Sequence, residues 1–176
     1  MVNIGLDVDG VLRDMMTPFV TKYNEEFSDG VTSYFDVKSY DLKESFPSYD
    51  SSMLYEWKNE LFRDAPRHLD TKGFVGEISR YGDVHIVSAQ PFGLEDLTLE
   101  WLRKNEVLYE SVSFIEDKSL LDLDYLVDDN PKNINEAKGV GLGVLRPWNV
   151  NSNQGVFMKP STIVSYLSRV EGGLYR

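Results

Sequence analysis

Five short apolar runs alternate with helical patterns along this chain, and this alternation limits the fold more than any other feature. Each run is β-branched or aliphatic and nearly continuous, as is typical of parallel strands covered on both faces. The predicted strands are Asn3–Val8, Asp83–Val87, Ser111–Ile115, Tyr125–Val127 and Gly141–Leu145. The predicted helices are Thr71–Tyr81, Leu94–Lys104, Pro131–Lys138 and Ser161–Val170. We therefore predict an α/β fold, a three-layer αβα sandwich around a doubly wound parallel sheet.

The alternation is interrupted after the first strand. Residues 16–68 have no clear strand pattern but hold many aromatic residues. We predict that they form a small helical cap, inserted into a core domain of residues 1–15 and 69–176. Most of the aromatic side chains in this cap are expected to build its own hydrophobic core.

Composition excludes several classes of function. The 176 residues carry a formal charge of −11, so a basic face for a nucleic-acid polymer is not expected. There is no cysteine, which excludes disulfides, thiolate catalysis and cysteine-based zinc sites, and two histidines are too few for a multi-histidine metal centre. No signal peptide and no apolar stretch of membrane-spanning length are visible, so we expect a soluble, cytoplasmic protein without membrane contact.

The first predicted strand ends in DVDG, residues 7–10. Because Asp-Gly favours turns and strand ends in such sheets carry ligands, this motif by itself fits a turn and a binding site equally well. A calcium loop can be tested directly. If Gly10 were its invariant glycine, the first and last ligands would be Gly5 and Met16, and neither has a side-chain oxygen. That interpretation fails.

A second acidic pair, Asp128-Asp129, follows the fourth predicted strand and precedes Asn130-Pro131. The carboxyl ends of parallel strands meet at one edge of the sheet, so we expect both acidic pairs to share one crevice. Carboxylates this close repel one another, and a divalent cation is the expected counter-charge. Oxygen ligands favour Mg²⁺ over zinc.

Two further residues suit a phosphate in the same crevice. Ser88 directly follows the second predicted strand, where its hydroxyl and the N–H of Ala89 could hold a phosphate oxygen, although a helix cap is the simpler interpretation. Lys118 lies ten residues before Asp128. By itself it is a surface lysine, but a site of carboxylates and phosphate needs a cation to join them.

These four motifs, in this order, resemble the haloacid dehalogenase superfamily of phosphotransferases. "DVDGVL", "LVDDNP" and the later Arg146-Pro147-Trp148-Asn149 are similar to its 5′(3′)-deoxyribonucleotidase family. The resemblance implies that Asp7 is the nucleophile that forms an aspartyl-phosphate. It implies that Asp9 protonates the leaving group and then takes a proton from water.

The resemblance also implies a ligand set. Mg²⁺ would be held by the carboxylates of Asp7 and Asp128 and the backbone carbonyl of Asp9, with Asp129 orienting a metal-bound water. Lys118 would be catalytic together with Asp7 and Asp9. The residues expected at the phosphate are Asp7, Asp9, Gly10, Ser88, Ala89 and Lys118.

The expected substrate is a small phosphate ester, specifically a (deoxy)nucleoside monophosphate. A base needs a flat aromatic face, so the candidate contacts in the cap are Phe19, Phe35, Trp57 and Phe62. For Arg13 and Arg67 we expect surface ion pairs, with a contact to phosphate or base as the alternative. The family resemblance further implies pairing into a homodimer.

Three other functions stay open at this stage. The first is a phosphatase of the same chemistry for another small phosphate, such as a sugar phosphate. The second is a 3′-phosphatase acting on DNA ends, which the acidic charge disfavours. The third is a non-catalytic protein that binds a metal or nucleotide on this fold, since fold does not fix function.

Overall fold

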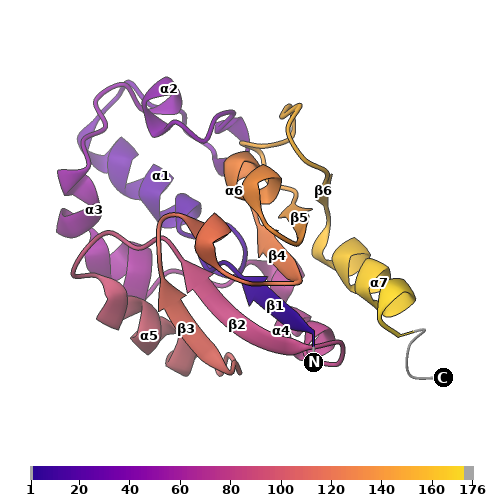
Figure 1. Cartoon of the computed structure of the whole chain (residues 1–176). Helices are drawn as coiled ribbons and strands as arrows, with labels where there is room; N and C mark the ends of the chain where they lie inside the picture. The colour runs from indigo at the N-terminus through magenta and orange to yellow at the C-terminus, as the bar shows by residue number, and fades with distance from the viewer. Residues whose placement is uncertain (1, 173–176) are drawn as a thin grey trace.

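The computed structural model describes residues 2–172, and its centre is a parallel sheet with strand order β3-β2-β1-β4-β5-β6 (Figure 1). The strands are β1 (Asn3–Leu6), β2 (Asp83–Ser88), β3 (Ser111–Phe114), β4 (Tyr125–Asp128), β5 (Val140–Val144) and β6 (Phe157–Met158). The predicted fold class and the five predicted strands are confirmed, with ends shifted by one or two residues. The sixth strand was not predicted. It is two residues long and pairs only with β5 at the sheet edge, so it leaves no apolar run to recognise.

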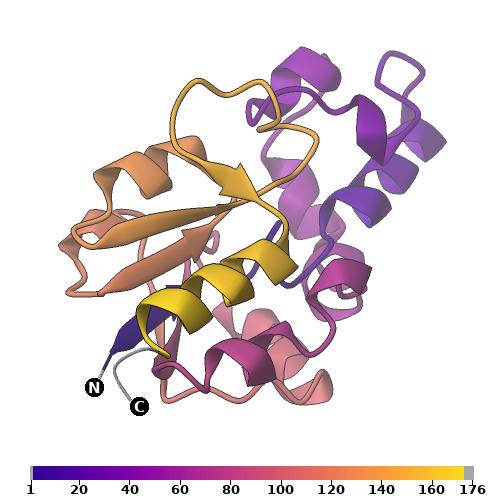
Figure 2. The ribbon, with the colours of Figure 1, turned by 90° about the vertical axis from the view of Figure 1, so that its right-hand side faces the viewer.

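Helices cover both faces of the sheet. They are α4 (Phe74–Ile78), α5 (Glu95–Lys104), α6 (Pro131–Glu136) and α7 (Pro160–Val170). Figure 2 shows α6 on one face and α4 with α7 on the other. Successive strand residues point to opposite faces, and one of these faces supplies most of the main core. That core is formed by Ile4, Leu6, Val84, Ile86, Val127 and Val144 of the sheet with Phe74, Trp101, Ile163 and Leu167 of the helices.

The helix predicted over Thr71–Tyr81 is broken in the structure. A 3₁₀ turn at Leu69–Thr71 comes first, and α4 begins only after Gly73, whose φ of +79° is left-handed. The other helices agree with the prediction to within two residues, and Asn130 caps α6 by accepting a hydrogen bond from the N–H of Lys132 at 2.9 Å. Among residues 2–172, none of the helices is both long and apolar enough to cross a membrane.

Residues 16–68 are mostly helical and turn-forming. They contain α1 (Met16–Glu26), α2 (Leu42–Ser45) and α3 (Ser52–Glu56), a 3₁₀ turn at Tyr34–Asp36 and a π-helical turn at Asn59–Arg63. Their apolar side chains form a second cluster, which also takes in Leu94 and Trp148 from the rest of the chain. Arg13 and Arg67, at the two ends of the insert, lie side by side in a single β-bridge. The division into two domains stays a prediction.

β1 is an inner strand of the sheet, between β2 and β4. Leu6 pairs with Ile86 of β2 on one side and with Val127 of β4 on the other. The chain order of the strands reverses between β1 and β4, which is where ligands bind in open α/β sheets. The strand arrowheads point toward residues 16–68, drawn in purple (Figure 2).

Candidate active site

Three strand ends bring the predicted polar residues together. Asp7 follows β1, Ser88 ends β2 and Asp128 ends β4. The backbone N–H of Asp7 donates to the carbonyl of Val127 at 3.0 Å, which ties the end of β1 to that of β4. Residues more than 80 positions apart in the sequence thus line one crevice.

Asp7, Asp128 and Lys118 form a buried group of charges in this crevice. Nζ of Lys118 lies 2.7 Å from Oδ1 of Asp7 and 2.6 Å from Oδ2 of Asp128. Burial raises the pKa of Asp7 to about 7; Lys118 opposes this rise and Asp128 adds to it. Burial alone would lower the pKa of Lys118, but the carboxylates of Asp7 and Asp128 hold that pKa above its usual value. Lys118 therefore stays a cation inside the group.

Asp128 is oriented by the turn that follows it. Its Oδ1 accepts from the backbone N–H of Asn130 at 2.8 Å, and its Oδ2 accepts from Nδ2 of Asn133 at 2.9 Å. Asn133 lies in the first turn of α6, where Pro131 starts the helix. The sequence DDNP thus begins helix α6 and also orients the carboxylate of Asp128.

Asp129 completes the acidic cluster. Burial raises its pKa well above the usual range, and the neighbouring carboxylates of Asp128 and Asp7 add to the rise. Its Oδ2 accepts from Nε1 of Trp148 at 2.6 Å, whereas its Oδ1 is buried and has no hydrogen-bond partner within the described part of the chain. Gly10 lies against this carboxylate. Its φ is +75°, and a Cβ at that position would collide with Asp129.

The acidic cluster fits a divalent cation. One oxygen each from Asp7, Asp128 and Asp129 lies within 4.8 Å of the others. Of these three buried carboxylates, Asp7 and Asp128 share the ammonium of Lys118, and Asp129 pairs with no cation among the described residues, so carboxylates outnumber cations here. The unpartnered Oδ1 of Asp129 is a further oxygen that a cation would satisfy. The cluster could therefore hold a metal ion with hard oxygen ligands.

Asp9 has entirely different surroundings. Nε of Arg13 donates to its Oδ1 at 2.7 Å, and Nη2 of Arg13 donates to its Oδ2 at 2.8 Å. Nε2 of Gln90 also donates to Oδ2, at 2.7 Å. The expectation of a surface ion pair for Arg13 is wrong on position, because its side chain is completely buried beneath the insert. Arg67 is half-buried, and its Nη1 donates to the carbonyl of Asn105.

The segment after β5 makes hydrogen bonds to the backbone of both acidic motifs, DVDG and DDNP. Nε of Arg146 donates to the carbonyl of Gly10 at 2.6 Å, and Nη1 of Arg146 pairs with Asp70 at 2.9 Å. Nδ2 of Asn149 donates to the backbone carbonyl of Asp129 at 2.8 Å. In the sequence, the run RPWN (residues 146–149) contributed to the family resemblance. Its contacts with the two acidic motifs could not be anticipated from local pattern.

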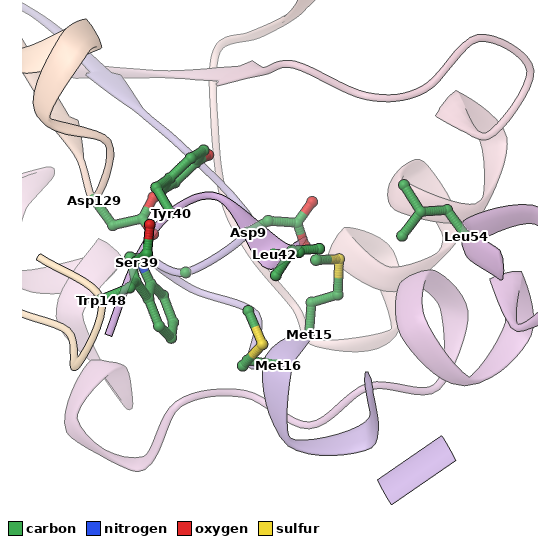
Figure 3. A pocket seen from close by; sticks show the side chains of 10 residues that line it. Asp9, Met15, Met16, Ser39, Tyr40, Leu42, Leu54, Asp129 and Trp148 are labelled. Carbon is green, nitrogen blue, oxygen red and sulfur yellow. The ribbon is translucent and has the colours of Figure 1, made fainter. Parts of the chain in front are cut away.

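Two cavities adjoin at Asp9. The polar cavity, about 330 Å³, is lined by Asp7, Asp9, Tyr40, Ser88, Ala89, Glu116, Lys118, Asn130, Lys132 and Asn133. The apolar cavity, about 210 Å³, is lined by Asp9, Gly10, Met15, Met16, Ser39, Tyr40, Leu42, Leu54, Asp129 and Trp148 (Figure 3). Asp9 and Tyr40 belong to both. Sequence analysis missed Tyr40, which lies in a loop without any motif.

The four aromatic residues expected at the substrate lie elsewhere. Phe19, Trp57 and Phe62 are buried in the core of the insert, with at most 4% of each residue exposed. Phe35 is 78% exposed, and none of the four belongs to the residues found lining either cavity in residues 2–172. Aromatic content alone could not separate side chains that build a core from those that face a ligand. Trp148, outside the insert, both packs on its core and lines the apolar cavity.

Known proteins resemble this chain in sequence and in fold. The family model described as 5′ nucleotidase, deoxy (pyrimidine), cytosolic type C protein matches residues 1–156. The chain belongs to this family. It is therefore a nucleotidase, a phosphoric monoester hydrolase. The nucleotidase family and the enzyme class inferred from the sequence are thereby confirmed, and the fold is that of solved haloacid dehalogenase-like hydrolases.

One sequence relative and two solved structures illustrate these similarities, the structures for the fold alone. A 5′(3′)-deoxyribonucleotidase from Clostridium acetobutylicum is 26% identical over 140 residues, which are 77% of this chain and 77% of that protein. A haloacid dehalogenase-like hydrolase from Streptococcus pneumoniae has a TM-score of 0.63 at 12% identity, covering 94% of this chain and 98% of that one. A hydrolase of the same superfamily from Deinococcus radiodurans, solved with phosphate and sodium, has a TM-score of 0.59 at 13% identity, covering 95% of each chain.

Proposed function

We propose that the protein is a magnesium-dependent phosphatase that hydrolyses (deoxy)nucleoside monophosphates through an aspartyl-phosphate on Asp7. The arrangement of Asp7 carries this proposal. Its carboxylate lies 2.7 Å from the ammonium of Lys118 in a cavity that also contains the hydroxyl of Ser88. A nucleophile, a cation for the phosphate and a separately held second carboxylate are what phosphoryl transfer needs.

The reaction then has two displacements. In the first, an oxygen of Asp7 bonds to phosphorus while the bond from phosphorus to the sugar oxygen breaks, and that oxygen takes a proton from Asp9. In the second, water bonds to phosphorus and gives a proton to Asp9, while the bond from phosphorus to Asp7 breaks. Inorganic phosphate leaves, and both aspartates return to their starting states.

Lys118, Ser88 and the N–H of Ala89 are proposed to hold the transferring phosphoryl oxygens. Lys118 is well suited to this because its ammonium is fixed between two carboxylates and cannot swing into solvent. Fixed positive charge inside a water-poor crevice stabilises a phosphoryl transition state more than the same charge in water does.

Asp7, Asp128 and the backbone carbonyl of Asp9 would hold Mg²⁺, with Asp129 as a ligand or as the holder of a bound water. Mg²⁺ bound there would neutralise charge on the phosphoryl group and let it approach three carboxylates. The hydrogen bond from Trp148 to Asp129 leaves the other oxygen of Asp129 for this role.

The nucleoside is proposed to occupy the apolar cavity. That cavity adjoins the polar cavity through Asp9 and Tyr40, and much of its wall comes from the insert. Met15, Met16 and Trp148 offer apolar surface to a base (Figure 3). We propose these three residues as base contacts in place of Phe19, Phe35, Trp57 and Phe62. The name of the Clostridium relative, a 5′(3′)-deoxyribonucleotidase, supports the same substrate class.

The substrate class is tested by measuring phosphate release from a panel of deoxynucleoside monophosphates, ribonucleoside monophosphates and sugar phosphates, with Mg²⁺ and with EDTA. We expect the highest kcat/KM on a deoxynucleoside monophosphate and no turnover in EDTA. A large preference for sugar phosphates would favour the alternative phosphatase. Unchanged turnover in EDTA would contradict the metal proposal.

The intermediate is tested separately by quenching the reaction and reducing it with borohydride, which converts an acyl phosphate on aspartate to homoserine. Mass spectrometry should find this change at residue 7. Modification at Asp9 instead would reverse the two roles. A homodimer and a cytoplasmic location stay predictions, for which mass photometry and cell fractionation are the measurements.

A further inference from the structure

We propose that Arg13, Gln90 and Thr98 form a clamp that fixes the carboxylate of Asp9, and that this clamp determines how well the enzyme expels a strongly basic leaving group. The inference rests on the proposed function, since it assigns Asp9 the proton transfer. It concerns three residues that do not act on the phosphate themselves.

The clamp is a closed ring of hydrogen bonds. Arg13 holds both oxygens of Asp9, at 2.7 and 2.8 Å, and its Nη2 also donates to Oγ1 of Thr98 at 3.0 Å. The hydroxyl of Thr98 donates to Oε1 of Gln90 at 2.8 Å, and Nε2 of Gln90 returns to Asp9 at 2.7 Å. Two arms, one charged and one neutral, therefore converge on one carboxylate.

The chemistry of the donors sets every direction in the ring. A guanidinium can only donate, so the Thr98 oxygen must accept from Arg13 and use its own hydrogen toward Gln90. The Gln90 amide is then forced to turn its carbonyl to Thr98 and its NH₂ to Asp9, and the same NH₂ makes a longer hydrogen bond to Oγ of Ser88 at 3.3 Å. A ring without alternative proton arrangements holds its carboxylate in one orientation.

Burial holds two members of the clamp rigidly, Arg13 and Thr98, whereas Gln90 is half-buried. The Arg13 side chain is completely buried, and Thr98 has no exposed surface. Nη1 of Arg13 donates to the carbonyl of Phe62 at 2.6 Å, and its guanidinium lies 5.1 Å from the Phe62 ring centre and 5.5 Å from that of Trp101. Arg13 is thus enclosed by the insert and α5, which leaves it to serve Asp9 rather than the phosphate.

The location of Asp9 explains why the orientation of its carboxylate has to be fixed. It lies two residues after Asp7, at the junction of the polar and apolar cavities, where phosphate and leaving group would meet. Without the clamp, its carboxylate could turn toward the acidic cluster or solvent. A general acid contributes only when it is within hydrogen-bond reach of the leaving oxygen.

The test compares two substrates that differ in their need for a proton. A deoxynucleoside 5′-monophosphate expels a basic alkoxide, whereas p-nitrophenyl phosphate expels a stable phenolate that needs no acid. The ratio of kcat/KM for the two reports the first displacement only. The main variant is Gln90→Met, which removes the neutral arm, and its matched control is Gln154→Met, at an exposed glutamine outside both cavities.

We expect Gln90→Met to lower kcat/KM for the nucleotide about 10- to 100-fold and that for p-nitrophenyl phosphate less than about threefold. Gln154→Met should change neither. Thr98→Val, which removes the hydroxyl in the middle of the ring, should give the same pattern at about three- to tenfold, with Thr21→Val on α1 as its control. Circular dichroism and melting curves establish whether each variant is folded. If Gln90→Met is unfolded, the kinetics of Thr98→Val decide the test.

Three results would overturn the clamp. Equal losses on both substrates would mean a purely structural role, a rise in KM with unchanged kcat would mean direct contact with substrate, and no change would mean no role. Failure of the proposed function is distinguishable. In that case the unmodified enzyme would hydrolyse neither phosphate ester, or Asp7→Asn would keep full activity.

Discussion

Asp7 and Asp9 belong to one four-residue motif, yet their surroundings are opposite. Asp7 is 6% exposed, lies near the buried carboxylates of Asp128 and Asp129, and shares the ammonium of Lys118 with Asp128. Asp9 is more exposed and is held by a guanidinium of its own and an amide. Burial and like charges raise the pKa of Asp7 to about 7. Two aspartates that are two positions apart can therefore have different chemical roles, because their surroundings differ.

The largest effect is expected from removing the proposed nucleophile. Asp7→Asn should reduce turnover at least about 10⁴-fold on nucleotides and on p-nitrophenyl phosphate alike, because both need the bond from phosphorus to Asp7. Phosphate release measures this, and circular dichroism checks that the fold persists. Full activity in this variant would remove Asp7 from the mechanism.

Asp9→Asn sharpens the comparison, because it should discriminate between substrates where Asp7→Asn does not. We expect kcat/KM to fall about 10²- to 10⁴-fold for a nucleotide, with a much smaller fall for p-nitrophenyl phosphate, whose leaving group needs no proton. Parallel kinetics on the two substrates measure the difference. Equal losses would show that Asp9 acts on the phosphoryl group itself.

Lys118→Met should affect the Asp7 side of the site and leave the Asp9 side intact. Turnover should fall about 10²- to 10³-fold, because a fixed cation is lost from the phosphoryl site. Unfolding free energy should fall by about 3 kcal/mol or more, because Asp7 and Asp128 lose their shared partner. Steady-state kinetics and urea titration in EDTA measure both. Lys72→Met, at an exposed lysine, is the control, and a similar change there would make the effect nonspecific.

Stability without metal should also depend on pH through Asp7. A carboxyl with a raised pKa binds more protons in the folded state, so its contribution to the free energy of unfolding falls as pH rises from about 4 to about 7. Asp7→Asn lacks this loss. We therefore expect the variant to gain stability relative to the parent by a few kcal/mol between pH 4 and pH 8. Urea denaturation in EDTA at several pH values measures it.

His68 is the reason for using a difference between two proteins in that experiment. Burial, with the charge of Arg146, lowers the pKa of His68 to about 4. Its neutral form favours folding, so its contribution to stability rises with pH between about 4 and 6.5 and opposes that of Asp7. The contribution is common to both proteins and cancels. A pH-independent difference would contradict the raised pKa of Asp7.

Local pattern was sufficient for the strands and for the strand-end residues. Asp7, Ser88 and Asp128 each end an apolar run, and parallel pairing necessarily brings such ends to one edge of the sheet. Lys118 was placed by the order of the motifs, and the structure brings it between Asp7 and Asp128. Whether these residues act as proposed stays for the experiments above.

Local pattern was insufficient for the insert. Its aromatic residues have neither a strand period nor a motif, so Phe19, Trp57 and Phe62 could not be distinguished from ligand contacts until their packing was known. Tyr40 lies in a loop, and loop residues reach a site through the path of the chain rather than through a periodic pattern.

The sheet, its layers and the chemical type of the site could be inferred from the sequence, because hydrophobic period and residue identity are local properties. What each aspartate contacts became known only from the folded chain. The partners of Asp9 include Gln90, 81 positions away, and those of Asp129 include Trp148, 19 positions away. Such contacts depend on how the insert and the later loops pack on the sheet. Their energy comes from burial and hydrogen-bond geometry, which no single stretch of sequence encodes.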